Sequence, residues 1–461
     1  MKKQSFILSL VMSFVIIFSS CKKEEEIQPE NPVAEQPGGD NNGGGGSTTP
    51  PKPIVIAYTI KKSESTVDGS KLNLPAGSYV AIEAGQRGTL HLKNFEGAPG
   101  KPITFINAKG GQTVIKGSGW WALKTSECKN IRITGTGSSS SKYGILIDGG
   151  HNSFSLQDLS TDFEVDHVEV KNSGFAGIMA KTDPNCDSKT WRDNFTMRNI
   201  SLHHNYIHDV GGEGFYIGNS FYADGRSESC GKVYPHEIHG LKLYENITKN
   251  TGCEGIQVGC ATKGCEIYNN SIDNYGTDPF ANYQNNGLQL GAGTGGKCFN
   301  NKIVKGPGNG IIVNGIGGNL IYNNLIVDAG SLGIFCDERS HPIGGYSFIN
   351  NTIVNSGSDG MRLYSDVVPM NDVINNIIIN PKSGKYINTS GGVKLNEKNN
   401  YTSMDVASAK FVNPSAGNYA LSASSPAVNK GANTGSFGIY KDIIGKTRPS
   451  GATYDIGAYE Y

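Results

Sequence analysis

Apolar and polar positions repeat along the chain from about residue 200 onward. Short segments such as YNNLI and INNTI recur with an Asn in the same column. Consecutive members of this column lie 23 to 41 residues apart. The column comprises Asn205, Asn246, Asn270, Asn301, Asn324, Asn351 and Asn376. Self-similarity at such a period is the signature of a solenoid, in which each repeat packs against the next.

A second column follows each Asn and has the form Gly, apolar, any residue, apolar, as in GIQVG and GLQLG. A period of two predicts a strand with one buried face. Two inward stacks are expected from this strand: Phe215, Ile256, Leu288, Ile311, Ile334 and Met361, and Ile217, Val258, Leu290, Val313, Cys336 and Leu363. A third stack precedes the Asn column by three residues: Leu202, Leu243, Ile267, Cys298, Ile321, Phe348 and Val373.

These columns predict an all-β fold, a single-stranded right-handed parallel β-helix of roughly 10–12 coils with a hydrogen-bonded Asn ladder. Irregular versions of the same rhythm are present at 103–107, 131–135, 145–149, 168–170 and 177–181. A β-propeller needs four strands in about 40–45 residues, and a leucine-rich repeat needs a Leu framework. Neither pattern is present.

The chain divides into four parts by composition. Residues 1–20 have a signal-peptide pattern, with two lysines before an apolar run from Phe6 to Phe18. A membrane span, the alternative, needs roughly 20 apolar residues. Residues 21–53 are rich in Glu, Pro, Gly and Asn and predict a disordered tether. The β-helix is expected over 54–393, and a C-terminal coil or capping segment over 394–461.

Charge and glycine content narrow the function. Lys+Arg and Asp+Glu both number 41, so the formal net charge is zero. Nucleic-acid-binding surfaces carry a basic excess, so no nucleic-acid partner is expected. The 62 glycines show no Gly-X-Y period and indicate many tight turns.

The nine cysteines include one at the end of the export signal, which leaves eight in an oxidising compartment. Cys265, Cys298 and Cys336 fall at apolar core positions of the repeat, which argues against a full disulfide framework. Cys186 and Cys230 lie in long polar loops after equivalent strands of neighbouring coils. They form the one disulfide that we expect.

Three segments carry a family resemblance: LHLKNFEGAPGKPITFINAKGGQTVI (90–115), FVNPSAGNYALSASSPAVNKG (411–431) and DIIGKTRPSGATYDIGAYEY (442–461). They resemble the N-terminal coils and shared C-terminal tail of pectate-lyase-like right-handed β-helix proteins of Bacteroidota. The resemblance covers about residues 54–461. It implies that a polysaccharide binds along one parallel sheet, in a groove walled by loops. It also implies that the tail caps the last coil, whose bare strand edge invites aggregation.

The end of the signal also carries a resemblance. Phe18-Ser19-Ser20-Cys21 resembles a bacterial lipoprotein cleavage box, in which the Cys is lipidated. The acidic run that follows resembles the export tag of Bacteroidota surface lipoproteins. We therefore expect lipidation at Cys21, a lipid anchor in the outer membrane, and exposure on the cell surface.

Carboxylates in adjacent coils mark a candidate site. Glu213 and Glu254 precede the Gly of neighbouring coils, about 5 Å apart at the backbone. Such carboxylates repel unless a cation lies between them or one is protonated. With Asn286 next in the row, the oxygen ligands suit Ca²⁺, the one cofactor expected. Alternatively, the two Glu residues cap the strand entrance, or hydrolyse a glycosidic bond as an acid–base pair.

Long loops at 181–195 and 218–238 wall the same sheet. Its outward positions offer Tyr216, Gln257 and Gln289 as sugar contacts. A lyase needs a base and a cation beside a uronate. The loops supply Lys181 and His236 as catalytic candidates, and Tyr222 and Arg226 as further substrate contacts.

The chain departs from known subfamilies. It lacks the Lys-then-Arg strand pair of the alginate and chondroitin lyases and the paired-Asp pattern of the polygalacturonase-like hydrolases. Three functions therefore remain open: a polysaccharide lyase or glycoside hydrolase, a non-catalytic glycan-binding protein, and an adhesive β-helix. We expect a monomer whose partner is an acidic rather than a neutral polysaccharide.

Overall fold

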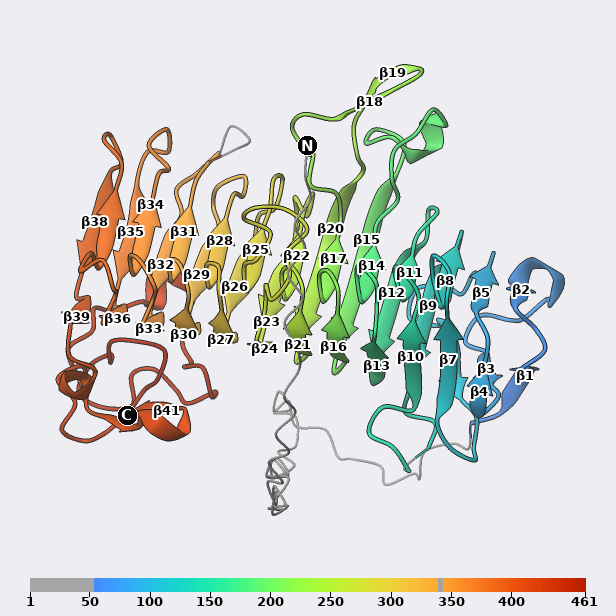
Figure 1. The fold of residues 1–461 in the computed structure, drawn as a ribbon, viewed down its shortest axis with the longest axis horizontal. Coiled ribbons are helices and arrows are strands. Elements are labelled where there is room, and N and C mark those ends of the chain that lie inside the picture. The colour runs from blue at the N-terminus through green and yellow to red at the C-terminus, as the bar shows by residue number, and fades with distance from the viewer. Residues whose placement is uncertain (1–53, 139, 339–342) are drawn as a thin grey trace, which may run out of the picture. The chain divides into compact units, whose positions relative to one another are not determined.

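The described part of the chain folds as a parallel β-helix. A computed structural model describes residues 54–138, 140–338 and 343–461, so the predicted signal, lipidation site and tether lie outside the described residues. Three long parallel sheets, here called A, B and C, contain 13, 12 and 12 strands. From β3 onward each coil passes through sheet A, then C, then B, and the coils stack in sequence order (Figure 1).

The strands follow the order of the coils. Sheet A comprises β1 (Ile56–Ile60), β3 (Tyr79–Ile82), β6 (Ile103–Asn107), β9 (Lys129–Thr134), β12 (Thr161–Asp166), β15 (Thr196–His203), β20 (Glu237–Tyr244), β23 (Glu266–Tyr268), β26 (Lys297–Phe299), β29 (Leu320–Tyr322), β32 (Ser347–Ile349), β35 (Asn371–Ile374) and β38 (Leu395–Lys398). Sheet B comprises β2 (Thr66–Asp68), β5 (Leu90–Lys93), β8 (Leu123–Ser126), β11 (Phe154–Leu156), β14 (Ile178–Ala180), β17 (Phe215–Ile217), β22 (Ile256–Val258), β25 (Leu288–Leu290), β28 (Ile311–Val313), β31 (Ile334–Cys336), β34 (Met361–Leu363) and β37 (Ile387–Thr389). Sheet C comprises β4 (Gly85–Arg87), β7 (Thr113–Gly117), β10 (Ile145–Gly149), β13 (Val168–Lys171), β16 (Tyr206–Val210), β21 (Ile247–Thr251), β24 (Ser271–Asp273), β27 (Lys302–Gly306), β30 (Leu325–Ala329), β33 (Thr352–Val354), β36 (Ile377–Ile379) and β39 (Tyr401–Ser403).

Short elements lie between and after the coils. Two antiparallel hairpins pair β18 (Arg226–Glu228) with β19 (Gly231–Val233), and β40 (Phe411–Asn413) with β41 (Asn418–Leu421). Single 3₁₀ turns occupy η1 (Gly69–Lys71), η2 (Ser188–Thr190), η3 (Val406–Ala409), η4 (Pro414–Ala416) and η5 (Gly435–Phe437). Within the described ranges, no helix has the length and apolar character that crossing a membrane requires.

The predicted inward stacks are confirmed. In sheet B, Phe215, Ile256 and Leu288 align in register on successive coils, and each is fully buried. The third stack aligns in the same way in sheet A. Leu202, Leu243 and the later members of that stack are also fully buried. One apolar core runs through all coils because no single coil closes its own.

The Asn ladder is also confirmed. Each Asn donates from Nδ2 to Oδ1 of the Asn in the next coil, at 2.9–3.1 Å, from Asn205 as far as Asn400. The same Nδ2 atoms also donate to a main-chain carbonyl of the preceding coil, as Asn301 does to Ile267. These buried amides are therefore satisfied, which a buried polar group requires.

The C-terminal segment packs on the side of the helix. After β38 and β39 extend sheets A and C, Phe411, Tyr419 and Leu421 pack against the outer face of β30, β33 and β36. The apolar residues of the last coil, such as Ile387 and Leu395, are only half-buried. A cap over that end is thus not shown by the described residues.

Candidate functional site

The candidate site is the outer face of sheet B. Its outward residues align in register across successive strands, as Tyr216, Gln257 and Gln289 do in β17, β22 and β25. Tyr216 and Gln289 are half-buried, and Gln257 is 5% exposed. The strands carry these side chains outward because their neighbours on either side point into the core. The three predicted sugar contacts therefore form one row.

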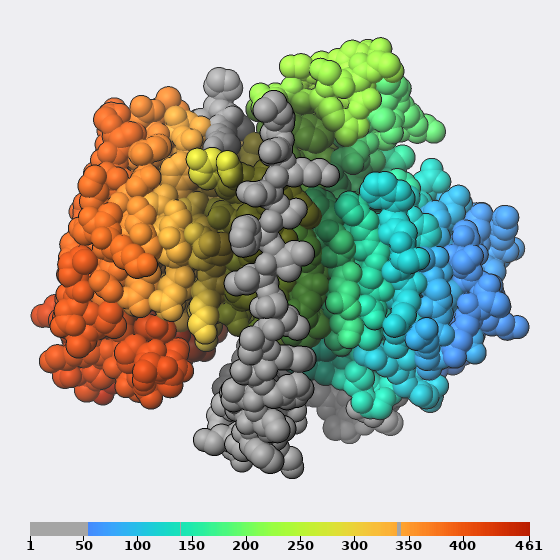
Figure 2. Space-filling view, in the orientation of Figure 1, coloured from blue at the N-terminus to red at the C-terminus, as the bar shows by residue number. Residues whose placement is uncertain are grey.

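The predicted loops wall this face and are tied to each other. A disulfide joins Cys186 to Cys230, as the sequence predicted. Arg226 donates to the carbonyl of Pro184 at 2.6 Å, and the Arg192 guanidinium lies 4.0 Å from the ring of Tyr222. The two loops are drawn in green as a projection at one side of the molecule (Figure 2).

Tyr222 and Arg226 are thus loop ties, a role that differs from the predicted sugar contacts. The Tyr222 hydroxyl donates to Glu237 Oε1 at 3.0 Å, and Arg226 forms an ion pair with Glu228 at 2.7 Å. Both polar groups are engaged within the loops and their bases. These contacts hold the two long loops in place beside sheet B.

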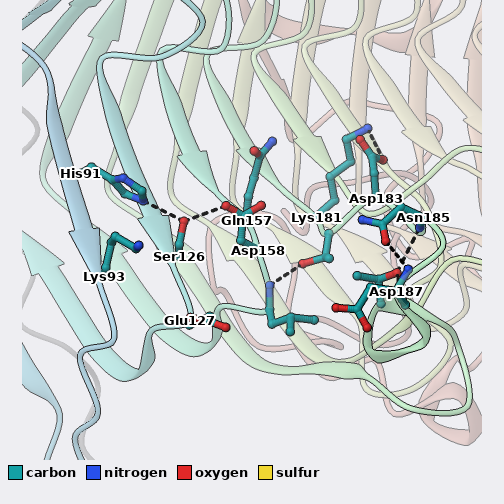
Figure 3. A pocket seen from close by; sticks show the side chains of 13 residues that line it. His91, Lys93, Ser126, Glu127, Gln157, Asp158, Lys181, Asp183, Asn185 and Asp187 are labelled. Carbon is teal, nitrogen blue, oxygen red and sulfur yellow. Dashed lines mark hydrogen bonds and ion pairs between the residues drawn. The ribbon is translucent and has the colours of Figure 1, made fainter. Parts of the chain in front are cut away.

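A row of hollows follows sheet B. The first, of about 440 Å³, is lined by residues of β5 and β8 and by the start of loop 181–195 (Figure 3). The second, of about 310 Å³, lies over Gln257 and Gln289. The third, of about 560 Å³, extends from Gln289 to Arg362 and shares Gln289 with the second. The second and third hollows share Gln289 and Asn314, and the first lies over earlier strands of the same sheet, so all three follow one face, here called the track, as a polymer needs.

Lys181, a catalytic candidate from the sequence, lies at the first hollow. Its Nζ is 3.0 Å from Asp183 Oδ1 and 4.6 Å from the centre of the Tyr216 ring. Because Lys181 is engaged as the cation of an ion pair, it suits a role as a cation better than a role as a base.

The sequence missed a polar chain beside Lys181. His91 Nε2 lies 2.8 Å from Ser126 Oγ, which donates to Asp158 Oδ2 at 2.7 Å (Figure 3). Lys124 Nζ also contacts Asp158 Oδ2 at 2.7 Å. Burial lowers the pKa of His91, and the charges of Lys124 and Lys93 lower it further. The imidazole is therefore neutral at pH 7, with lysines close by.

His236 does not fit the predicted catalytic role. It is fully buried, its Nε2 accepts from the Thr182 amide at 3.0 Å, and its Nδ1 lies 3.0 Å from the Glu237 carbonyl. Burial lowers the pKa of His236 to about 4. Both ring nitrogens hold the main chain of the loop, so no substrate reaches them.

Glu213 and Glu254 come together as predicted, but below the surface. Glu213 is 2% exposed and Glu254 is fully buried. Burial raises the pKa of each to about 7, and for Glu254 the charge of Glu213 adds to the increase. A polymer on sheet B does not reach carboxylates at this depth, so the predicted hydrolytic pair is not supported.

The rest of the predicted metal row is hydrogen-bonded. Asn286 donates from Nδ2 to Glu254 Oε1 at 2.9 Å, and its Oδ1 accepts from Asn309 at 2.8 Å. The thiol of Cys253, which the sequence did not single out, lies beside the two carboxylates. Burial raises the pKa of this thiol to about 12.

A second cluster missed by the sequence lies on sheet A. Donor atoms of Glu164, Asp166 and His203 lie within 4.8 Å of one another. Arg132 Nε contacts Glu164 at 3.0 Å and Asp166 at 2.8 Å, so a cation already lies between the carboxylates. This cluster is electrostatically satisfied and faces away from the track.

Comparisons with known proteins add little to this site. No protein-family model matches the chain, and no curated protein matches it. Solved structures with a similar fold include the pectate lyase Pel9A, at 14% identity over 88% of this chain and 97% of that one, with a TM-score of 0.43. A GH136 lacto-N-biosidase from Eubacterium ramulus has 14% identity over 76% and 67%, with a TM-score of 0.45. A PL6 family polysaccharide lyase from Pseudopedobacter saltans has 15% identity over 73% and 92%, with a TM-score of 0.39.

Proposed function

We propose that this protein holds an acidic polysaccharide along the outer face of sheet B and cleaves it by β-elimination. One observation carries the proposal: neutral His91 lines the first hollow together with Lys93 and Lys181, and Lys124 lies beside it through its contact with Asp158. A lyase needs this combination of a base and cations. Of the four acidic residues that line this hollow, Asp158 pairs with Lys124 and Asp183 with Lys181, whereas Glu127 and Asp187 form no ion pair among the described residues.

The reaction assigns a role to each group. The lysines bind the carboxylate of a uronate and stabilise the enolate that forms when the adjacent carbon loses its proton. His91 takes that proton on Nδ1, because Ser126 accepts the Nε2 proton and donates its own to Asp158. The bond from the neighbouring carbon to the glycosidic oxygen then breaks, and the leaving oxygen takes a proton from solvent or a nearby acid. A carbon–carbon double bond remains on the new end.

Glycan binding without cleavage is the second candidate. The observation that favours it is the burial of Glu213, Glu254 and His236, three of the four catalytic residues that the sequence predicted. A track of hollows with a polar floor serves binding alone equally well.

The deciding experiment incubates the purified full chain with acidic and neutral polysaccharides and weighs the products. Fragments one water lighter than hydrolysis products support β-elimination. Fragments of normal mass indicate a hydrolase and refute the mechanism. Binding without fragments, measured by calorimetry on the same glycans, supports the second candidate. Neither binding nor cleavage contradicts both.

The cellular location belongs to the same proposal. A lipid anchor at Cys21, on the outer face of the outer membrane, would present sheet B to external polysaccharide. Replacing Cys21 with Ser is expected to release the protein from the membrane fraction. Retention of the variant in the membrane, or protection of the unmodified protein from protease added to whole cells, would refute this placement.

A further inference from the structure

Three side chains meet below sheet B in the turns that lead into β17 and β22. Glu213 is 2% exposed, and Cys253 and Glu254 are fully buried. One donor atom from each lies within 4.8 Å of the other two. They are brought together because Glu213 precedes Gly214, which leads into β17, while Cys253 and Glu254 precede Gly255, which leads into β22 of the next coil.

The two carboxylates are incompletely satisfied. Oε2 of Glu213 and Oε2 of Glu254 are both buried and have no hydrogen-bond partner. Among the residues that the structure describes, neither Glu takes part in an ion pair, and the nearby Lys181 is engaged by Asp183. Leaving one charged group buried without a partner costs several kcal/mol. Two such groups within 4.8 Å of each other call for a positive charge between them.

The thiol supplies the second line of evidence. A proton shared by the carboxylates would relieve their repulsion but would leave the nearness of Cys253 unexplained. Its sulfur lies within 4.8 Å of a carboxylate oxygen of each Glu, so the three side chains offer one sulfur and two oxygen donors to the same point.

We propose that Glu213, Cys253 and Glu254 bind a zinc ion. Sulfur and carboxylate ligands suit Zn²⁺, whereas Ca²⁺ takes six to eight oxygens. Donors on a tetrahedral zinc lie roughly 3.3–3.8 Å apart, given bonds of about 2.0–2.3 Å, so the present cluster closes onto the ion with small movements. The oxygen of Asn286, the ligand expected from sequence, already accepts from Asn309.

The ion would have a structural role. It would join the turns that start β17 and β22, and these strands carry Tyr216 and Gln257 into the row on sheet B. Because the three ligands are buried, the ion would be enclosed and would not meet substrate. The inference does not depend on glycan cleavage, and its test requires no activity.

The experiment measures metal content and coordination in the purified full chain. Elemental analysis is expected to find one zinc per chain. Replacement by Co²⁺ is expected to give the near-ultraviolet charge-transfer absorption of a cobalt–thiolate bond. Cys253→Ser and Glu254→Gln are each expected to weaken zinc binding by more than about tenfold. Cys260→Ser is the matched control, since Cys260 is a buried free thiol of the same coil whose Sγ donates to the Asn219 carbonyl.

Each outcome decides the proposal. Zinc lost in Cys253→Ser and retained in Cys260→Ser supports it, provided that circular dichroism shows both variants folded. Should Cys253→Ser fail to fold, the cobalt spectrum of the unmodified chain decides alone. A chain that binds neither zinc nor cobalt overturns the proposal. So does binding of Ca²⁺ alone that is indifferent to Cys253, which would restore the calcium site.

Discussion

His91 and His236 show how burial assigns different work to the same residue type. His236 is fully buried with both ring nitrogens in hydrogen bonds to the main chain. His91 is half-buried at a hollow and bonds through one nitrogen to Ser126. Only the second arrangement leaves a nitrogen for proton transfer. The two histidines differ in burial and in hydrogen bonding, so we predict a catalytic role for His91 and a structural role for His236.

The His91 prediction concerns the acid limb of the pH–rate profile. His91→Ala is expected to lower kcat/KM by about 10²- to 10⁴-fold, the usual contribution of a general base. The pKa of His91 is lowered by burial and then by Lys124. Lys124→Met removes a positive charge, so the pKa of His91 rises and the acid limb moves to higher pH. Lys116→Met is the control, because Lys116 pairs with Asp148 on sheet C. An unmoved limb in Lys124→Met would exclude His91 as the base.

The His236 prediction concerns stability. Burial lowers the pKa of His236 from 6.5 to about 4, so between these values the unfolded chain binds the proton and the folded chain does not. Its contribution is complete above pH 6.5, is lost as the pH falls toward 4, and amounts to roughly 3 kcal/mol. Urea unfolding at pH 7.5 and pH 5 is expected to show a smaller loss in His236→Gln than in the unmodified chain. Equal losses would contradict this assignment.

At the scale of elements, the Asn ladder is the strongest test of the fold. Asn301 donates to Ile267 and Asn324 and accepts from the amide and side chain of Asn270. Asn301→Ala leaves buried partners on both adjacent coils unsatisfied, at a cost of at least about 2 kcal/mol. Lys302→Ala, one residue on and exposed, is expected to stay within about 0.5 kcal/mol. Denaturant unfolding of both variants makes the comparison, and equal stability would refute the ladder's role.

The regular coils were predictable because each column repeats one physical demand. The Asn column and the three inward stacks carry residues of one type at nearly fixed spacing, and all of them are where the sequence placed them. The site was harder to predict. His91, Ser126 and Asp158 come from successive coils and are 35 and 32 residues apart, and β5 and β8 lack the Gly column. No spacing within one segment reveals a contact made between irregular coils.

Depth was the second thing that the sequence did not give. The position before each Gly predicted that Glu213 and Glu254 are neighbours, and they are. Spacing reports neighbours along the stack but not their distance from solvent, which depends on the turn and on loop 274–286 above it. In sheet C the signal was present in part: β30, β33 and β36 contain LIV, TIV and III, runs of apolar or β-branched residues that are typical of strands covered on both faces.

At the scale of the whole track, sheet B is long enough to contact several sugars at once. Ten strands from β5 to β34, at a spacing of about 4.8 Å, give a face about 43 Å long. His91 and Arg362 lie near opposite ends of it, at the first and third hollows. Cleavage at one end with binding along the rest predicts that affinity rises with oligosaccharide length until the track is filled.

Mutation of Arg362 tests whether the three hollows bind one continuous glycan or act independently. Its guanidinium is held by Asp359 at 2.7 Å and lines the third hollow, where we expect it to bind the carboxylate of a sugar far from His91. Arg362→Ala is expected to weaken binding of long acidic oligosaccharides on the order of tenfold, the value of one lost charge-assisted hydrogen bond. Oligosaccharides too short to extend from His91 to β34 are expected to bind and react unchanged. Lys385→Ala, an exposed cation near the same turn that lines none of the three hollows, is the control. A loss of affinity for short and long oligosaccharides alike would mean that Arg362 acts on the fold. No loss for either would mean that the glycan does not extend as far as β34.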